Sequence, residues 1–405
     1  MAEPGAASPL MRLDEALAQL LAMAGARPIV EREVVALALA DGRVLAEELI
    51  AGHDQPPWPN SAMDGYALRV EDWTGAPLPV SQRIFAGQLP APLQPGTCAR
   101  IFTGAPVPLG ADCVEMQENT DVQPTGAVHF NQPLRVGQNI RPQGQETQAG
   151  EQVLSAGIRL GAIELGLAAS MGLAWLPVIR RPRVAVLSTG DELVEPGRAL
   201  GPGQIYNSNR VLLNTWLARL GCEVIDAGIL PDDLALTRQR LDELHGVDLI
   251  LSTGGVSVGE ADFLGLALRE EGELTLWKLA IKPGKPLTCG TFRGVPVIGL
   301  PGNPASTLVT FALLARPYLM RRMGVQAVTP LHISVPAGFD WPRAGSRREY
   351  LRARLEGGHA VLYPNQSSGV LRSAAWADGL VQILEGHTLA AGDRVMFIPM
   401  SELLN

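Results

Sequence analysis

The chain has 405 residues, of which 46% are hydrophobic and 18% charged, and its formal net charge is −8. This composition excludes a disordered chain and is typical of a compact multidomain protein. The acidic balance argues against broad nucleic-acid binding, which needs a basic surface, and no RNP, helix-turn-helix or zinc-finger pattern occurs. The four cysteines form no CxxC pair, so we expect reduced, mostly buried thiols at Cys98, Cys113, Cys222 and Cys289.

The first predicted element is an amphipathic helix over residues 11–24, with Leu13, Leu17, Leu20 and Leu21 at helical spacing between charged residues. This pattern is not a cationic leader followed by an unbroken apolar stretch, and no run approaches the roughly 20 apolar residues of a membrane span. We therefore expect a cytoplasmic protein without a membrane segment. The apolar side of the helix looks exposed, which gives modest support for dimerisation.

The helical character ends near residue 50, where the chain becomes rich in proline and glycine, with short apolar runs between turns. Helical periodicity returns at residues 160–172, directly after this segment. We therefore predict a small β-rich domain, residues 51–149, inserted into a helical linker or dimerisation domain that comprises residues 1–50 and 150–180.

Strand–loop–helix alternation begins at Arg183 and continues for about 140 residues. Apolar runs predict strands and helical periodicity predicts helices, in the order 184–187 (strand), 208–220 (helix), 223–225 (strand), 234–245 (helix), 249–251 (strand), 265–271 (helix), 295–298 (strand) and 305–323 (helix). Residues 181–328 thus form a doubly wound parallel-sheet domain, and ligands of such sheets bind beyond the carboxyl ends of the strands. Residues 329–405 predict a C-terminal β domain, so the fold class is multidomain α/β.

All the lysines of the chain fall within eight residues, at Lys278, Lys282 and Lys285, whereas the other 30 basic residues are arginines. Lysine presents a compact ammonium group and arginine a wide planar fork, so the two are not interchangeable at a tight anion site. Chance or an exposed surface loop would also produce the cluster. We favour a loop that presents small ammonium groups to an oxyanion.

Three glycine-containing loops follow predicted strands and therefore meet at one edge of the sheet. They comprise residues 188–192 (STGDE), 252–262 (STGGVSVGEAD) and 299–306 (GLPGNPAS). Glycines let the backbone approach a ligand closely, and successive N–H groups at a helix start bind phosphate. Each loop alone is common. Together with the lysines they predict a phosphate or substrate site that includes Gly254, Gly255 and Ser257.

Carboxylates occupy the same edge at Glu192, Asp232 or Asp233, Glu260 and Asp262. Beside a phosphate they would repel the ligand unless a cation intervenes, so Mg²⁺ bridging carboxylate and phosphate oxygens is the functional interpretation. The structural alternative is a helix N-cap or first-turn acid, which we favour for Asp233 and Glu260. For Glu192 and Asp262 both interpretations stay open at this point.

These motifs resemble the molybdopterin molybdenumtransferases, the MoeA family that includes the gephyrin E domain. The similarity runs from Leu13 to the C-terminal β domain. Its most specific segments are residues 60–67 (NSAMDGYA), 103–108 (TGAPVP), 188–192, 252–262, 278–286 and 299–304. The resemblance implies elongated dimers of four-domain subunits with the active site between subunits. It also implies insertion of molybdate into molybdopterin adenylate, with Mg²⁺-dependent hydrolysis that releases AMP.

The resemblance also assigns site residues position by position. Asp64 and Thr103 match residues of the small domain that face the site from the partner subunit. The matching acidic, basic and loop positions are Glu192, Asp232, Asp262, Lys278, Lys282, Pro301 and Pro304, and Lys285 adds a substrate contact. Arg352 and Ser368 match in the C-terminal domain. Lys278 and Lys282 would hold molybdate or phosphate, while Glu192 and Asp262 would hold Mg²⁺ or orient water.

Two positions of the β-rich domain have open interpretations. Asp64 follows a proline-rich segment, so its carboxylate would only cap a turn in the structural alternative. Residues 141–146 read RPQGQE where family members often carry Arg-x-x-Gly-Glu-Asp. Glu146 is a metal ligand if its longer side chain replaces the aspartate. Otherwise the site tolerates the displacement, or the protein is slower or uses a modified pterin.

Two rival functions stay open. The sheet domain alone resembles the related molybdopterin adenylyltransferases, which would consume ATP and release pyrophosphate, but that function leaves the extra domains unexplained. A non-catalytic, gephyrin-like scaffold would bind peptides without metal or AMP release.

The expected partners are pterin and oxyanion substrates, a second copy of the chain and, transiently, other enzymes of molybdenum cofactor biosynthesis, with no nucleic acid and no membrane.

Overall fold

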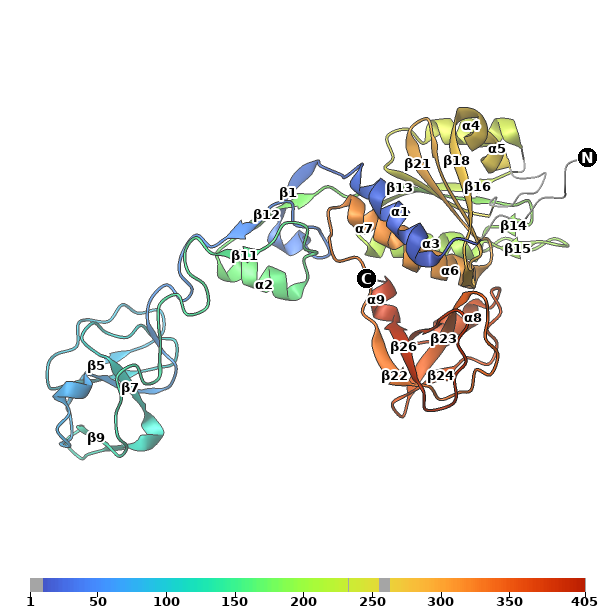
Figure 1. Cartoon of the computed structure of the whole chain (residues 1–405). Coiled ribbons are helices and arrows are strands. Elements are labelled where there is room, and N and C mark those ends of the chain that lie inside the picture. The colour runs from blue at the N-terminus through green and yellow to red at the C-terminus, as the bar shows by residue number, and fades with distance from the viewer. Residues whose placement is uncertain (1–9, 232, 255–262, 405) are drawn as a thin grey trace, which may run out of the picture. The chain divides into compact units, whose positions relative to one another are not determined.

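The computed structural model describes residues 10–231, 233–254 and 263–404, which form two compact units (Figure 1). Unit 1 comprises Met1–Ala46, Gly157–Ala162 and Trp175–Asn405, and unit 2 comprises Glu47–Ala156 and Ile163–Ala174. Both helices and several sheets occur, and the fold is multidomain α/β, as the sequence predicts.

Unit 1 contains a six-stranded sheet in the order β16-β13-β17-β21-β20-β18. Its parallel strands are β16 (Glu223–Leu230), β13 (Arg183–Thr189), β17 (Leu249–Thr253) and β21 (Val295–Leu300). By contrast, β20 (Pro286–Phe292) is antiparallel to both β21 and β18 (Gly272–Lys278). The four strands predicted from the sequence are parallel, as expected. The sheet also contains β18 and β20, which form an antiparallel hairpin where the sequence suggests only a lysine loop.

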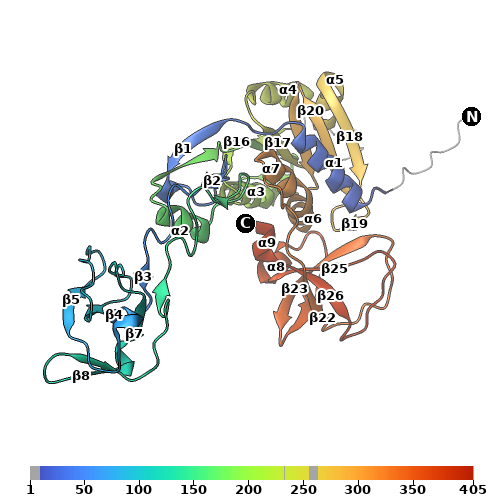
Figure 2. The same ribbon diagram turned by 60° about the vertical axis from the view of Figure 1, so that its left-hand side comes forward.

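Helices cover both faces of this sheet, which makes it doubly wound (Figure 2). One face carries α1 (Leu13–Gly25), α3 (Ser208–Arg219), α6 (Pro304–Thr310) and α7 (Arg316–Arg322), and the other carries α4 (Leu234–Glu243) and α5 (Phe263–Glu271). The alternation of the strands explains the two cores. Val184 of β13 packs with Leu213 of α3, whereas its neighbour Ala185 packs in the cluster that contains Leu241 of α4. A π-helical turn, Phe311–Ala315, joins α6 to α7.

Helix α1 packs against α7 inside unit 1. Leu13, Ala16, Leu20 and Ala24 form its buried stripe, at the i, i+3, i+4 spacing of an amphipathic helix. The expectation that this apolar side is exposed and supports dimerisation is therefore wrong. The chain uses it for its own core.

The C-terminal part of unit 1 is a mixed sheet in the order β19-β23-β25-β26-β22, with β24 on β23. Its elements are β22 (Ile333–Pro336), β23 (Arg348–Glu356), β24 (His359–Leu362), β25 (Gly379–Ile383), β26 (Arg394–Pro399), α8 (Leu371–Trp376) and α9 (Met400–Leu404). The edge strand β19 (Ile281–Lys282) belongs to the turn of the β18–β20 hairpin and pairs with β23. The lysine segment is thus held by two sheets at once.

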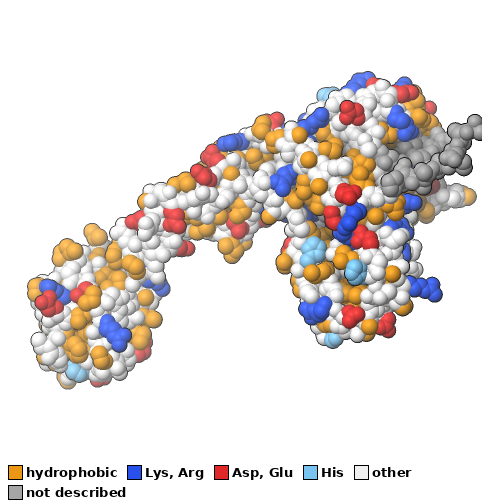
Figure 3. All heavy atoms as spheres, viewed as in Figure 1, with side chains coloured by type: hydrophobic (Ala, Val, Ile, Leu, Met, Phe, Trp, Pro, Cys, Tyr) orange, Lys and Arg blue, Asp and Glu red, His pale blue; other side chains and the backbone are white. Residues whose placement is uncertain are grey.

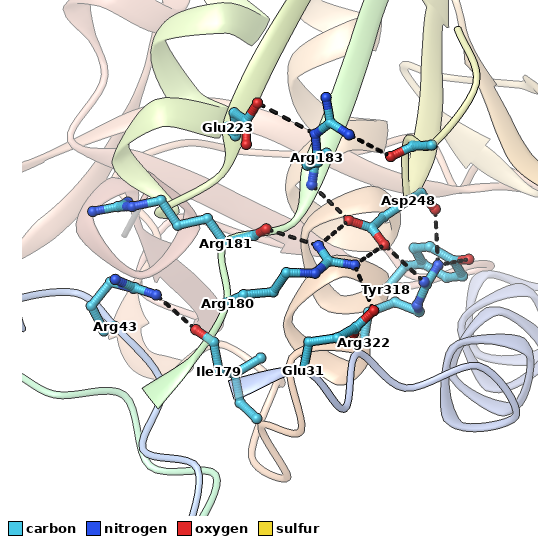
Figure 4. Close-up of polar contacts among 11 residues, drawn as sticks. Glu31, Arg43, Ile179, Arg180, Arg181, Arg183, Glu223, Asp248, Tyr318 and Arg322 are labelled. Carbon is cyan, nitrogen blue, oxygen red and sulfur yellow. Dashed lines mark hydrogen bonds and ion pairs between the residues drawn. The ribbon is translucent and has the colours of Figure 1, made fainter. Parts of the chain in front are cut away.

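The amino ends of the parallel strands, which we call the amino edge, are tied together by arginines around Asp248 (Figure 4). Arg180 Nη1 lies 2.7 Å from Asp248 Oδ2, and the Arg183 N–H donates to the same oxygen. Arg322 Nη1 donates to the Asp248 carbonyl at 2.9 Å. Burial raises the pKa of Asp248, but the hydrogen bonds from Arg180 and Arg183 and the nearby positive charges outweigh it and hold the pKa below its ordinary value.

Unit 2 is rich in short strands. Its four-stranded sheet has the order β5-β6-β4-β7. The elements are β4 (Gly65–Leu68), β5 (Val80–Ile84), β6 (Cys98–Ile101) and β7 (Cys113–Met116), with the pairs β8 (Thr120–Val122) and β9 (Val128–Phe130), β3 (Asn60–Ser61) and β10 (Ile140–Arg141), and β2 (Leu49–Ile50) and β11 (Gln152–Leu154). Most of α2 (Ala162–Ser170) also belongs to it. In unit 1, β1 (Arg32–Ala36) pairs with β12 (Trp175–Ile179).

All four cysteines are buried and form no disulfide, which confirms that prediction, and burial raises the pKa of Cys222 to about 12. On the face drawn in Figure 3, Lys and Arg side chains are interspersed with Asp and Glu side chains. Among residues 10–231, 233–254 and 263–404, no helix is both long and apolar enough to cross a bilayer.

Candidate active site

The carboxyl ends of β13, β17 and β21, which we call the carboxyl edge, meet at a cavity of about 320 Å³. It is lined by Thr189 at the end of β13 and by Glu192 after it, by Gly254 after β17, and by Asn303 and Pro304 after β21. The structure thus brings three of the predicted site residues together: Glu192, Gly254 and Pro304. Their contacts with a ligand stay a prediction.

The loops after β13 and β17, which both contain the sequence Ser-Thr-Gly, contact each other at the wall of this cavity. Gly254 has φ +81°, and a Cβ there would lie 2.7 Å from the Thr189 carbonyl oxygen, so the position requires glycine. Thr253 Oγ1 donates to Ser188 Oγ at 3.2 Å, and Ser188 Oγ donates to Asn207 Oδ1 at 3.4 Å. These buried hydroxyls join β13 and β17 to the start of α3 and fix the cavity wall.

Glu192 is exposed at the cavity, and its carboxylate lies over Gly190. A Cβ at Gly190 would lie 2.8 Å from Glu192 Cδ, so glycine leaves the space that the carboxylate occupies. Carboxylate, hydroxyl and amide oxygens surround the cavity, and Mg²⁺ prefers such oxygen ligands. The donor types fit Mg²⁺, although the described residues contain no preformed group of three His, Cys, Asp or Glu side chains.

The hairpin formed by β18 and β20 carries all three lysines, and we call it the lysine hairpin. It lies at the same edge of the sheet. Because β18 and β21 are both antiparallel to β20, they run in the same direction, and Lys278 ends β18 where Leu300 ends β21. Lys282 Nζ lies 3.1 Å from Glu349 Oε2, and the lysine side chain is 53% exposed. Lys285 is exposed as well. Within the described part of the chain, none of these lysines lines the 320 Å³ cavity.

The loop after β21 is fixed by three hydrogen bonds. Thr307 Oγ1 donates to the Pro301 carbonyl at 2.6 Å, and Asn209 Nδ2 donates to the Gly302 carbonyl at 2.6 Å. Pro304 occupies the first turn of α6, where its missing N–H costs nothing. The Ala305 N–H then donates to the Ser368 carbonyl at 2.9 Å, so Ser368 reaches this loop through its backbone.

Arg352 is fully buried, at 0% exposed. Its guanidinium donates to Ser373 Oγ at 3.0 Å and to the Ser367 carbonyl at 3.1 Å. Burial lowers the pKa of Arg352 to about 10. In this structure the side chain holds the loop that carries Ser368, and its contact with substrate stays a prediction.

The predicted site residues of unit 2 form their own contacts. Asp64 Oδ1 accepts hydrogen bonds from the Thr103 N–H at 2.8 Å and from Thr103 Oγ1 at 2.7 Å. These bonds lower the pKa of Asp64, so the carboxylate stays charged at neutral pH. Both bonds join residues that are 39 positions apart in the sequence. The Asp64 carboxylate therefore binds a distant loop and does not cap its own turn. Glu146 lines a second cavity, of about 430 Å³, together with Asn60 and Arg141.

Some predicted positions lie outside the described residues: Asp232, Gly255, Ser257, Glu260 and Asp262. The neighbouring Asp233 is described. Its carboxylate accepts from the Leu236 N–H at 2.8 Å at the start of α4, which confirms the N-cap interpretation.

Three residues of the carboxyl edge were not found from the sequence. Asn207 and Asn209 line the cavity at the start of α3, and Glu349 pairs with Lys282. The asparagines carried a weak signal, since two amides flanking a serine before a helical pattern are typical of an N-cap. Glu349 gave none, because only the pairing of β19 with β23 brings it to the lysine.

The fold and the site define a multidomain α/β protein with a polar cavity at the carboxyl edge of a doubly wound sheet. Three family models match in order: the MoeA N-terminal region (domain I and II) at residues 11–172, a probable molybdopterin binding domain at 185–321, and the MoeA C-terminal region (domain IV) at 334–400. The molybdopterin molybdenumtransferase of Haemophilus influenzae is 40% identical over 92% of this chain and 95% of its own length. Molybdopterin molybdenumtransferase 2 of Mycobacterium tuberculosis is also 40% identical over the same shares.

Solved structures agree with this assignment. A molybdopterin biosynthesis MoeA protein from Pyrococcus horikoshii matches with a TM-score of 0.83 and 28% identity, covering 96% of this chain and 100% of its own. A second structure of a MoeA protein from this organism has a TM-score of 0.77 and 32% identity. The chain belongs to the MoeA family of molybdopterin molybdenumtransferases, as its motifs predict. It is a transferase of molybdenum cofactor biosynthesis.

Proposed function

We propose that the protein inserts molybdate into molybdopterin adenylate and hydrolyses its phosphoanhydride. Water attacks phosphorus, the P–O bond of the anhydride breaks, and AMP leaves. Molybdate forms two bonds to the dithiolene sulfurs, and one of its oxygens leaves as water with the two thiol protons, so molybdenum keeps its oxidation state. The observation that carries the proposal is that the carboxyl edge holds both a polar cavity and the lysine hairpin. One region can therefore bind an uncharged end and an anionic end of the same substrate.

The lysines supply the positive charge of this mechanism. Lys278 and Lys282 hold the oxyanion, either molybdate or phosphate, and Lys285 adds a contact from the same hairpin. Glu349 lies 3.1 Å from Lys282 Nζ and orients the ammonium group. A fixed ammonium stabilises charge that develops on the leaving phosphate without a covalent intermediate. Pro301 and Pro304 keep the neighbouring loop in place.

We propose that the reaction requires Mg²⁺, which when bound supplies positive charge between carboxylate and phosphate oxygens. Glu192 is the described residue placed to hold it, because its carboxylate stands at the cavity. Asp262 is the second proposed ligand and Asp232 a further acidic site residue. The backbone of Gly254 and Gly255 and the hydroxyl of Ser257 are proposed to contact the substrate beside them.

The proposed assembly is a cytoplasmic homodimer with the active site between subunits. Asp64 of the partner subunit, held by its bond to Thr103, would then face the cavity, and Glu146 of the partner subunit would add a metal ligand. Each subunit would have four domains with the predicted boundaries: residues 1–50 with 150–180, 51–149, 181–328 and 329–405. Arg352 and Ser368 of the last domain would close the substrate site.

The test is AMP release and cofactor formation from molybdopterin adenylate, with and without molybdate and Mg²⁺. We expect AMP to appear only when both are present, together with a cofactor that activates an apo-molybdoenzyme. ATP consumption with pyrophosphate release would instead establish an adenylyltransferase. Peptide binding without any AMP release would establish a scaffold.

A further inference from the structure

Two amide side chains in the cavity wall have a hydrogen-bonding group left over. Asn207, the N-cap of α3, is 2% exposed, and its Oδ1 accepts from the Arg210 N–H at 3.3 Å and from Ser188 Oγ at 3.4 Å. Both bonds use the oxygen, which fixes the orientation of the amide. Its Nδ2 therefore remains a donor, and it has no partner among the described residues.

Asn209 shows the opposite polarity. It is 8% exposed, and its Nδ2 donates to the Gly302 carbonyl at 2.6 Å. Its Oδ1 is thus turned away from that bond, and within the described part of the chain this acceptor has no partner. The wall of one cavity therefore contains one spare donor and one spare acceptor, two residues apart in sequence.

Such groups are costly to leave unpaired. Buried polar atoms in native proteins are almost always hydrogen-bonded, and each exception calls for an explanation such as a ligand. Both atoms are also screened from bulk solvent. Both residues line the cavity, so a ligand edge contacts these atoms when it packs against this wall and displaces it slightly.

The remaining lining indicates the kind of edge. Ile205, Tyr206 and Leu193 contribute apolar surface, and Ile205 and Tyr206 are 55% and 45% exposed. Among the described lining residues Glu192 is the only charged one. Such a site suits a flat, uncharged ring better than a phosphate or molybdate, whose negative charge the lysine hairpin is equipped to meet.

We infer that Asn207 and Asn209 recognise the heterocyclic end of the substrate edge-on. A ring acceptor, such as a carbonyl oxygen, takes the Asn207 Nδ2–H, and an adjacent ring N–H or amino group donates to Asn209 Oδ1. The inference rests on the proposed function, because molybdopterin adenylate carries two heterocycles with such an edge, the pterin and the adenine. The shared chemistry is a neighbouring acceptor and donor on a planar nitrogen ring.

Equilibrium binding tests this pair without any turnover. The intact protein is titrated with 6-hydroxymethylpterin, with its N3-methyl derivative, which lacks the ring N–H, and with AMP. Asn207→Asp is the informative variant, because Asp keeps the oxygen that caps α3 and replaces the spare donor by an acceptor. Asn365→Asp is the matched control, since Asn365 Oδ1 likewise accepts a backbone N–H, that of Ser367 at 3.0 Å, outside this cavity.

We expect Asn207→Asp to weaken the binding of the pterin or of AMP roughly tenfold or more, as expected when a buried partner is lost. Asn365→Asp should leave the same affinity unchanged. Whichever probe loses affinity identifies the ring that enters the cavity. If that ring is the pterin, N3-methylation should cause a comparable loss with the wild-type protein, which requires no variant to fold.

The inference would be overturned if wild type and Asn207→Asp bound each probe with equal affinity. It would also be overturned if neither the pterin nor AMP bound measurably to wild type. The outcome is separate from that of the proposed function. A protein that binds the ring through Asn207 yet releases no AMP keeps this inference and loses the proposed reaction. Normal AMP release by Asn207→Asp with unchanged probe affinity keeps the reaction and removes the asparagine pair.

Discussion

The amino edge and the carboxyl edge of the six-stranded sheet are formed by the same strands, but they differ in whether their buried polar groups have hydrogen-bond partners. At the amino edge, the carboxylate of Asp248 is satisfied by Arg180, by the Arg183 N–H and by the charge of Arg322. At the carboxyl edge, Asn207 Nδ2 and Asn209 Oδ1 have no partner among the described residues. The first arrangement stabilises the fold, while the second keeps hydrogen-bonding capacity for a ligand.

The contrast extends to the carboxylates of the two edges. Asp248 is largely enclosed by its arginine partners, whereas Glu192 is exposed at the cavity and rests over Gly190. Removing a buried, paired charge costs stability, and removing an exposed one costs little unless it serves a function. Substitutions at the two edges should therefore separate stability from activity.

The largest effect on stability is expected at the amino edge. Asp248→Asn should lower the free energy of unfolding by about 3 kcal/mol, because it removes the carboxylate that Arg180 and Arg322 share and leaves Arg180 only its exposed pair with Glu31. Urea unfolding followed by tryptophan fluorescence measures the loss. Glu223→Gln is the matched control: its ion pair with Arg183 is exposed, so its unfolding midpoint should stay within about 0.5 kcal/mol of wild type. Equal losses in both variants would remove the special role of Asp248.

Two glycines with similar backbone conformations sharpen the comparison. Gly254→Ala at the carboxyl edge should lower the free energy of unfolding by about 2–3 kcal/mol, because the new Cβ would lie 2.7 Å from the Thr189 carbonyl oxygen. Gly294 lies in the β20–β21 turn at the amino edge, has φ +84°, and an added Cβ would meet no atom within 4 Å. Gly294→Ala should therefore lower the free energy of unfolding only by the backbone cost of about 1 kcal/mol. Thermal or urea unfolding distinguishes them, and equal losses would contradict the contact between the two Ser-Thr-Gly loops.

A charge-conserving substitution tests the lysine hairpin. Lys282→Arg should keep the unfolding midpoint but reduce AMP release at least roughly tenfold, because a forked guanidinium does not occupy the place of a compact ammonium beside Glu349. The measurement is the single-turnover rate with molybdopterin adenylate. A rate equal to that of wild type would show that any cation serves at this position.

The pH dependence of stability gives the smallest effect. Because the folded-state pKa of Asp248 lies below its ordinary value of 3.8, its ion pairs contribute stability above that value. This contribution is lost as the pH falls through the lowered pKa. The difference in unfolding free energy between wild type and Asp248→Asn should therefore be constant near neutrality and shrink below about pH 4. A difference that grows on acidification would contradict the assigned direction.

The elements with clear periodicity were predictable. The strand at Val184 and the helices α3 and α4 appear near their predicted positions. Each has a buried face, and the spacing of its apolar residues indicates that face in the sequence. The hairpin of β18 and β20 was missed. Its strands flank the lysine cluster, and the alternation of strands and helices in the sequence predicts only a loop in that region.

The site was predictable as a set of loops, but not as a set of contacts. Glycine-containing segments after strands suffice to bring Glu192, Gly254 and Pro304 to one edge. The pairing of Lys282 with Glu349, and the spare groups of Asn207 and Asn209, depend on tertiary packing. No local pattern reveals that a buried amide has one atom unpaired, because this follows from which neighbours the fold supplies.

The most direct test compares single-turnover AMP release from molybdopterin adenylate by Glu192→Gln and Asp248→Asn, each normalised to folded protein. We expect Glu192→Gln to be roughly a hundredfold slower with a wild-type unfolding midpoint. Asp248→Asn should react at the wild-type rate despite its lower stability. Wild-type turnover by Glu192→Gln would contradict the assignment of the carboxyl edge as the active site.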